Sequence, residues 1–384
     1  MRSFAAAAAA SLLALVLPVL SSPLKVPIPA ANGPVEKDSY IVTLKPGVDK
    51  TAHLAALASV LASTDSHIAY NYTTVLDGYA GTIKGAALDF VQSSKDVAHI
   101  EYDHIVQLSF KEPTNEEATA EAAAVEPLAN GGAGVTLYGI DTGIYTAHQA
   151  FGGRARWGAT FGGYKDADGN GHGTHTAATA VGARYGRATS ANIIAVKVLS
   201  DSGSGKNSDI IAGVNYAVNA ALKTRRPSII TMSLGGPAGP NSQALDKAVA
   251  DGIAKGVHFT IAAGNDNKDS STFSPADVAP ANTIGAVDSK NVKASFSNHG
   301  PGIDVWAPGV NILSAWIGSP SASRSISGTS MATPYVAGIL AVALGESKAK
   351  LSPAQLTSQL KAHAKPVVTG IGNTGSTNLL ATAW

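Results

Sequence analysis

The sequence predicts a doubly wound α/β domain, in which a mostly parallel sheet carries helices on both faces, preceded by a small α+β domain. From residue 128 to residue 384, short apolar runs alternate with helical patterns, as they do where helices join the strands of a parallel sheet. Several of these runs are apolar on both faces, which is expected of strands covered on both sides. Residues 38–110 instead show the order β-α-β-β-α-β, the split βαβ pattern.

Residues 1–22 have the pattern of a signal peptide. A short basic start precedes an uncharged run of Ala, Leu and Val over residues 4–17, and Pro18 and small residues follow. A membrane anchor is the alternative, but Pro18 interrupts the run and no basic stop-transfer flank follows closely. We therefore expect a secreted, extracellular protein, or one delivered to a vacuole-like compartment, with no membrane span once the signal is removed.

Residues 38–110 contain segments with strand-like alternation and segments with helical spacing. Residues 40–45 alternate like a strand, and residues 50–63 have helical spacing and good helix formers. The expected strands are 40–45, 68–72, 80–83 and 97–106, and the expected helices are 50–63 and 86–93.

Residues 111–127 carry five Glu and many Ala but no aromatic residue. This composition indicates a solvated linker, and an exposed linker is readily cut by a protease. We expect maturation cleavage within it.

The second domain, residues 128–384, shows no internal repeat. Its expected strands are 135–140, 192–199, 228–234, 257–263, 282–287 and 303–306, and its expected helices are 173–181, 209–223, 241–255, 329–344 and 353–363.

Composition excludes several classes of function. Hydrophobic residues make up 45% of the chain and charged residues 14%, so a large core is expected rather than disorder. A formal net charge of +1 gives no field of one sign that would attract nucleic acid. The chain has no cysteine, which excludes disulfides and thiolate chemistry.

Three polar residues follow predicted strands or lie in glycine-rich turns. In parallel sheets, active residues collect at the edge formed by the carboxyl ends of the strands. Asp141 ends an apolar strand, and His172 lies between glycines that leave its ring accessible. Asn265 follows another apolar run, where its amide is placed to donate to an oxyanion. Taken alone, Asp141 is more often a cap, and Asn265 has a turn residue as its alternative interpretation.

Ser330 stands at the predicted start of a helix. Gly328 precedes it, residues 331–344 have a helical pattern, and Pro334 is tolerable only within the first helical turn. The N–H groups and dipole at such a position favour developing negative charge, although a plain N-cap is the alternative. The four polar residues supply an orienting acid, a base, a nucleophile and an oxyanion donor, in the order Asp, His, Ser.

Two patterns near His172 imitate metal-binding sites, but each lacks ligands that such a site needs. A run that begins at Asp166 imitates a calcium loop, but its twelfth position is Ala177 rather than Glu. His172 and His175 are three residues apart, without an HExxH motif or an evident third ligand, which argues against zinc. We interpret His175 as a structural histidine.

Six motifs resemble the subtilisin-like serine proteases, and the proteinase K group in particular. In family order they are 138–144 (YGIDTGI), 169–175 (GNGHGTH), 198–205 (VLSDSGSG), 233–236 (SLGG), 262–265 (AAGN) and 327–334 (SGTSMATP). Residues 38–110 look like the inhibitory propeptide of this family, so the resemblance covers most of the chain. It implies a subtilisin-like fold behind a ferredoxin-like propeptide, and a serine endopeptidase made as a zymogen.

The resemblance also implies a role for each site residue. Ser330 would attack the scissile carbonyl, His172 would take its proton, and Asp141 would hold the histidine tautomer. Asn265 and the Ser330 backbone N–H would bind the oxyanion. The residues implied in substrate binding are Ser202, Gly203, Ser204 and Gly205 on one side, Ser233, Leu234 and Gly235 on the other, and Ala262, Ala263 and Gly264 in the specificity pocket. Small pocket walls imply broad, apolar specificity.

No cofactor is implied for the chemistry, but a structural calcium ion is. Asp304 and the carbonyls of Ala279 and Ala281 match, by position, a calcium site of the proteinase K group. One carboxylate and two carbonyls leave the remaining ligands to water. An Asp that merely ends a strand is the alternative.

An active endopeptidase is the leading hypothesis: a monomer that acts on protein and peptide substrates and is inhibited by its own propeptide. A catalytically weak or inactive binding protein on the same fold is the alternative, suggested by the short segment before Asp141. An esterase of the α/β-hydrolase class is rejected, because it needs a G-x-S-x-G elbow with the acid and His after the Ser. Here Asp141 and His172 precede Ser330.

Overall fold

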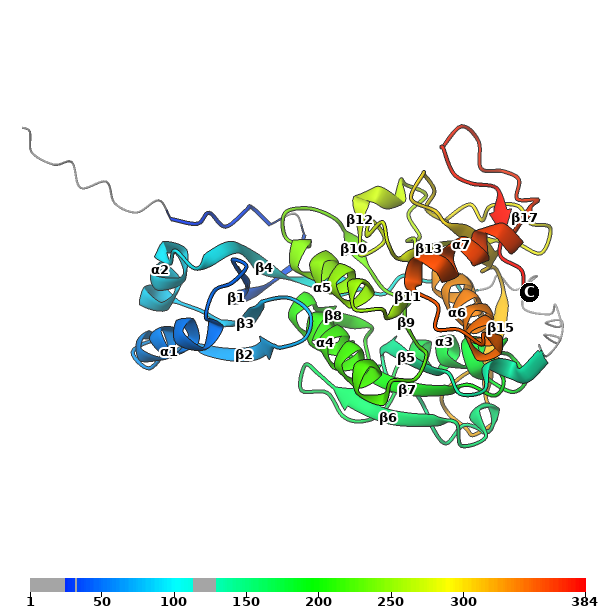
Figure 1. Ribbon diagram of the computed structural model, residues 1–384, viewed down its shortest axis with the longest axis horizontal. Coiled ribbons are helices and arrows are strands. Elements are labelled where there is room, and N and C mark those ends of the chain that lie inside the picture. Colours follow the sequence, from blue (N-terminus) through cyan, green and yellow to red (C-terminus); the bar gives the residue numbers. More distant parts are fainter. Residues whose placement is uncertain (1–24, 32, 113–128) are drawn as a thin grey trace, which may run out of the picture.

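The computed structural model describes residues 25–31, 33–112 and 129–384, which form a small and a large unit side by side (Figure 1). The expected signal peptide, residues 1–22, lies outside the described residues, as does most of the expected linker, residues 111–127. Nowhere in the described ranges is there a helix that could cross a membrane by length and apolarity.

The small unit has the β-α-β-β-α-β order that the sequence predicts. Its elements are β1 (Val35–Leu44), α1 (Lys50–Leu61), β2 (His67–Tyr72), β3 (Gly78–Thr82), α2 (Gly85–Ser93) and β4 (Val97–Gln107). The strands form an antiparallel sheet in the order β2-β3-β1-β4. Val42, Tyr79 and Ile100 are fully buried between this sheet and the two helices, so the unit has a core of its own.

The large unit is built on a nine-stranded sheet in the order β17-β18-β14-β13-β11-β9-β5-β7-β6. The central strands are parallel, and β17 pairs antiparallel with β18 at one edge. The strand bounds are β5 (Thr136–Asp141), β6 (Ala155–Thr160), β7 (Asn192–Lys197), β9 (Ser228–Met232), β11 (His258–Ala262), β13 (Asn282–Val287), β14 (Val305–Pro308), β17 (Lys365–Pro366) and β18 (Leu379–Leu380).

Helices cover both faces of this sheet, as the sequence predicts (Figure 1). The helix bounds are α3 (His172–Val181), α4 (Asn207–Thr224), α5 (Gln243–Ala254), α6 (Thr329–Glu346) and α7 (Pro353–His363). On β9, Ile229 belongs to the apolar cluster shared with α3 and α6, and Ile230 to the cluster shared with α4 and α5. Because successive strand residues face opposite ways, both faces need apolar side chains.

Two kinds of element escaped the sequence analysis. The edge strand β6 contains Arg156 and Gly158 and is mostly half-exposed, so it lacks the apolar run by which the buried strands were predicted. Besides β17 with β18, two further short antiparallel pairs were missed: β10 (Gly236–Pro237) with β12 (Phe273–Ser274), and β15 (Ile312–Ala315) with β16 (Ser323–Ile326). Both pairs form through tertiary contacts that a local pattern does not reveal.

The two units are joined through a shared sheet. Strand β8 (Ser204–Lys206) of the large unit pairs antiparallel with β4 of the small unit, with Val106 opposite Gly205. Residues 108–112 then run from the end of β4 toward Ser330, Asn265 and His172.

Candidate active site

Asp141 and His172 meet at the carboxyl edge of the sheet. Asp141 is the last residue of β5, and His172 is the first residue of α3. His172 Nδ1 lies 2.9 Å from Asp141 Oδ1 and 3.0 Å from Oδ2, and both side chains are buried. An ionised carboxylate only accepts hydrogen bonds, so Nδ1 carries the proton and Nε2 is left with a free lone pair.

A second buried carboxylate, Asp168, ties these two segments together. Its Oδ1 accepts from Thr142 Oγ1 at 2.9 Å and from Gly171 N at 2.9 Å, and its Oδ2 accepts from Thr174 N at 2.9 Å. It therefore binds the turn after Asp141 to the first turn of α3, and burial raises its pKa. Sequence reasoning treated Asp168 only as part of a failed calcium loop, although an Asp shortly before a helix is a capping signal.

The other ring nitrogen of His172 is free for chemistry. Within the described part of the chain, the buried Nε2 has no hydrogen-bond partner. The ring of Phe110, from the segment after β4, stacks on the imidazole with centroids 5.5 Å apart. Ser330 Oγ does not reach Nε2 and instead donates to the carbonyl of Ser233 at 3.1 Å.

Ser330 is held at the start of α6 by an exchange of hydrogen bonds with Ser233. Pro334 lies in the second turn of the helix, so the expectation that it belongs to the first turn was wrong. A proline there lacks the N–H that would bond the carbonyl of Ser330. Ser233 Oγ donates to that carbonyl at 2.9 Å, so the missing helical bond is replaced by one that fixes the nucleophile candidate to its neighbour.

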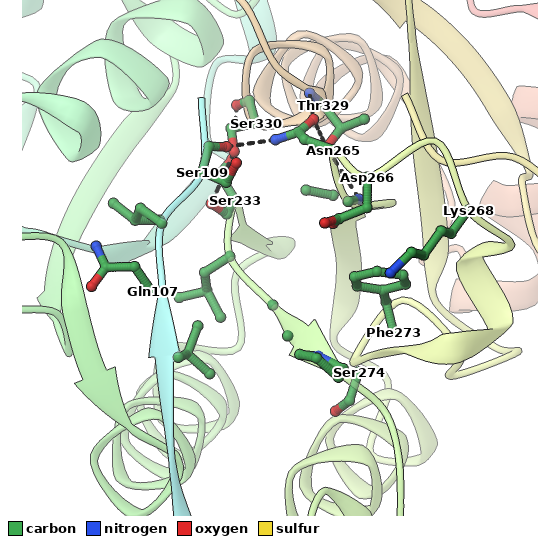
Figure 2. Close-up of a pocket in the computed structure, with 18 of the residues that line it drawn as sticks. Gln107, Ser109, Ser233, Asn265, Asp266, Lys268, Phe273, Ser274, Thr329 and Ser330 are labelled. Carbon is green, nitrogen blue, oxygen red and sulfur yellow. Dashed lines mark hydrogen bonds between the residues drawn. The ribbon is translucent and has the colours of Figure 1, made fainter. Parts of the chain in front are cut away.

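Asn265 is oriented by Thr329 and donates to the small unit. Its Oδ1 accepts from Thr329 N at 2.9 Å and from Thr329 Oγ1 at 3.0 Å. These contacts leave the NH₂ group pointing to the carbonyl of Ser109, with Nδ2 2.5 Å from the oxygen (Figure 2). The sequence analysis assigns no role to Thr329, so this orienting role was missed.

The segment before Ser109 lies along the expected substrate side of the site. Leu108 N donates to the Gly203 carbonyl at 2.9 Å, Gln107 Nε2 donates to the Ser202 carbonyl at 3.1 Å, and Val106 pairs with Gly205. Ser202, Gly203, Ser204 and Gly205 thus lie along an extended segment of the small unit.

A cavity of about 300 Å³ opens beside Ser109 (Figure 2). Ser233, Leu234, Gly235, Ala262 and Gly264 line it, together with Pro237, Asp266, Lys268 and Phe273, which the sequence analysis did not name. Ala263 does not line it. That side chain packs with Val287, Ile303 and Trp306 in an apolar cluster, because consecutive extended residues point to opposite sides.

Asp304, the expected calcium ligand, is paired with a lysine. Lys361 Nζ lies 2.6 Å from its Oδ1, and Thr283 N donates to its Oδ2 at 2.8 Å. A bound cation would have to displace the lysine ammonium.

His175 is structural, as the sequence analysis interprets it. It is fully buried, and its Nε2 lies 2.9 Å from the carbonyl of Ile312 and 3.1 Å from that of Arg324. Burial lowers its pKa to about 3, so it stays neutral and bonds α3 to the β15–β16 hairpin.

Both units match known families. Residues 132–380 match the subtilase family, and residues 39–109 match the family of peptidase inhibitor I9. The site residues lie within the first match, and the second match ends at the residue whose carbonyl Asn265 binds.

Individual proteins show the same likeness. Subtilisin-like protease 2 of Pseudogymnoascus destructans is 42% identical, covering 84% of this chain and 84% of the relative. Alkaline protease 2 of Aspergillus fumigatus is 43% identical over 71% of this chain and 60% of its own length. The crystal structure of a cold-adapted subtilisin-like serine proteinase is similar with a TM-score of 0.61 at 43% identity, covering 67% of this chain and 91% of that one.

Proposed function

The chain belongs to the subtilase family of serine endopeptidases and carries an I9 inhibitor domain, and on that premise we propose that Ser330 is its nucleophile. In this proposal His172 is the general base, Asp141 orients it, and Asn265 binds the oxyanion. The protein is made as a zymogen whose small unit, the propeptide, occupies the substrate site.

One observation carries the proposal: the side-chain amide of Asn265 donates to a backbone carbonyl of an extended segment, at 2.5 Å. That segment continues from β4, which pairs antiparallel with β8. A carbonyl held in this way is the group on which negative charge would develop during acyl transfer. The Ser109 carbonyl therefore stands in for the scissile carbonyl of a substrate.

The reaction requires one rearrangement of the side chains. Ser330 Oγ must turn from the Ser233 carbonyl to His172 Nε2, whose lone pair is free. His172 then takes the hydroxyl proton as Oγ attacks the carbonyl carbon, and later gives that proton to the leaving amine. Asp141, which contacts Nδ1 through both oxygens, stabilises the imidazolium in between.

The bond held in this position joins Ser109 and Phe110, and we propose that the precursor cuts itself there. This site differs from the expected cleavage within residues 111–127. Two observations favour it: the Asn265 contact with Ser109, and the stacking of Phe110 on the imidazole at 5.5 Å. The cut propeptide would remain paired with β8 as a competitive inhibitor.

The test compares the wild-type precursor with Ser330→Ala, both made in a protease-free host. The wild type should yield a product whose N-terminus is Phe110 and which hydrolyses casein. The Ser330→Ala chain should stay uncut and inactive. Phe110→Pro serves as a control that keeps the site residues but alters the bond to be cut, and it should stay uncut. A mature-length Ser330→Ala product would contradict self-cleavage.

For external substrates we propose broad specificity with an apolar residue before the scissile bond. The cavity of about 300 Å³ has small walls at Ala262 and Gly264 and an aromatic wall at Phe273. Ser109 is too small to fill it. A library of peptide substrates that varies this one residue would test the preference, and a preference for acidic residues, paired with Lys268, would contradict it.

We propose that the enzyme is secreted after removal of residues 1–22, since the pattern of the N-terminus favours export. We also propose that it acts as a monomer. We do not propose a calcium ion at Asp304, because Lys361 already neutralises that carboxylate.

A further inference from the structure

A second cavity lies at the edge of the sheet opposite the active site, where β9 and β11 begin. Its volume is about 560 Å³, and Ser228 and His258, the first residues of these strands, line it. The ends of α4, α5 and α6 form the rest of its wall. The volume falls within the range of about 300–1,000 Å³ that is usual for small-molecule sites.

This cavity is lined by cations. The positively charged lining residues are Arg225, Arg226, Lys255, Lys348 and Lys350, and no lining residue is acidic. Within the described ranges, none of the five cations takes part in an ion pair. Elsewhere on the chain, Lys197, Lys247, Lys361 and Arg324 each have a carboxylate partner.

Helix ends explain only part of this charge. Arg225 and Lys255 are C-cap residues of α4 and α5, and α6 ends at Glu346, just before Lys348. Each helix C-terminus carries about −0.5 of a charge, so three of them offset about 1.5 of the five positive charges. Counting the exposed Glu346 as well, a surplus of roughly two to three positive charges remains.

His258 provides an independent sign of a ligand. Its side chain is only 3% exposed, it lines the cavity, and its buried Nδ1 has no hydrogen-bond partner in the described chain. Burial and the charge of Lys350 lower the pKa of His258 to about 4, so the neutral ring can offer a hydrogen bond.

We propose that this cavity is a binding site for a polyvalent oxyanion of the phosphate or sulfate class. Its oxygens accept from the guanidinium groups of Arg225 and Arg226 and from the lysine ammonium groups, and an imidazole N–H of His258 donates at the floor. Bound there, the anion ties together the ends of α4, α5 and α6, which lie apart in sequence. It stabilises the fold from the side of the sheet that takes no part in catalysis.

The test uses the full-length Ser330→Ala precursor, which does not digest itself, and inorganic tripolyphosphate as the probe. Titration calorimetry should show saturable binding of one probe per chain. The thermal midpoint should rise by roughly 5 °C at about 100 times the dissociation constant. Sodium chloride at matched ionic strength should not reproduce the shift, and if it does, the proposal fails.

Paired variants separate a built site from general attraction to positive charge. Arg226→Gln combined with Lys348→Gln removes one cation beyond the end of α4 and one beyond the end of α6, and should weaken binding at least about tenfold. Lys223→Gln, on α4 itself but outside the cavity lining, should leave the affinity within about threefold. Equal losses in both proteins would overturn the proposal.

A third measurement does not depend on variants. The imidazole resonances of His258 should shift with the same saturation curve as the heat, and its pKa should rise when the anion binds, because nearby negative charge favours the charged ring. Resonances that stay unchanged at saturation would place the probe elsewhere and refute the site.

Discussion

Replacing Asn265 by Ala removes the side-chain donor that contacts the Ser109 carbonyl, which we propose to be the scissile carbonyl. Nδ2 lies 2.5 Å from the Ser109 oxygen, and the amide is fixed by two hydrogen bonds from Thr329 at 2.9 and 3.0 Å. The donor is therefore preorganised before the substrate reacts. Such donors stabilise the charge that develops in the transition state more than they stabilise the bound substrate.

The expected effect follows from that preorganisation. Loss of one oxyanion donor costs about 2.7–4 kcal/mol of transition-state stabilisation, so kcat should fall about 10²–10³-fold with little change in KM. Thr329→Val gives a graded comparison. It removes the hydroxyl contact but keeps the backbone N–H that holds Asn265 Oδ1, so about 1 kcal/mol, or roughly fivefold in kcat, is expected.

The assay is steady-state hydrolysis of a chromogenic peptide by matured enzyme, normalised by active-site titration. Asn265→Ala with kcat within threefold of the wild type would refute the oxyanion role. A rise in KM at unchanged kcat would also refute it, because the amide would then contribute only to ground-state binding.

Three further outcomes are expected. Asp168→Ala should lower the free energy of unfolding by about 3 kcal/mol in urea, because it leaves buried donors of the α3 N-terminus unpaired; unchanged stability would contradict its bridging role. Burial raises the pKa of Asp209, which accepts from Tyr70 of the propeptide at 2.7 Å, to about 6. Because its pKa is raised, the carboxyl is protonated at low pH, and this form favours the complex. The cut propeptide should therefore dissociate faster as the pH rises through about 6. Asp209→Asn should flatten this pH dependence. Chelation of calcium should leave the thermal midpoint of unfolding unchanged. Lys361→Met should lower that midpoint, because it leaves the Asp304 carboxylate without its cation. A midpoint that falls on chelation would instead support a calcium site.

The fold was predictable because continuous apolar runs alternate with helical patterns. The strands that end at Asp141 and before Asn265 are apolar on both faces, as is expected of a parallel sheet covered by helices. That same rule placed the two polar residues at one edge of the sheet. The position of His172 followed from its glycine-flanked turn and the helix after it.

Contacts between distant segments were not predictable from local sequence. Lys361, far along the chain, neutralises Asp304, and no local sequence pattern near Asp304 indicates this partner. Ala263 was assigned to the pocket with its neighbours, although strand alternation turns it into an apolar cluster. The contact between Asn265 and Ser109 forms only when the propeptide docks, and local sequence does not reveal it. The expectation of a cut within residues 111–127 therefore rested on composition alone.

The central claim is that Ser330 is a nucleophile activated by His172, and diisopropyl fluorophosphate tests it most directly. The wild-type enzyme, freed of its propeptide, should lose activity with one phosphoryl adduct, mapped by mass spectrometry to Ser330. A His172→Ala variant that is matured by added wild-type enzyme should remain unlabelled under the same conditions. An unlabelled Ser330 in the folded wild type, or equal labelling of the His172→Ala protein, would contradict the account.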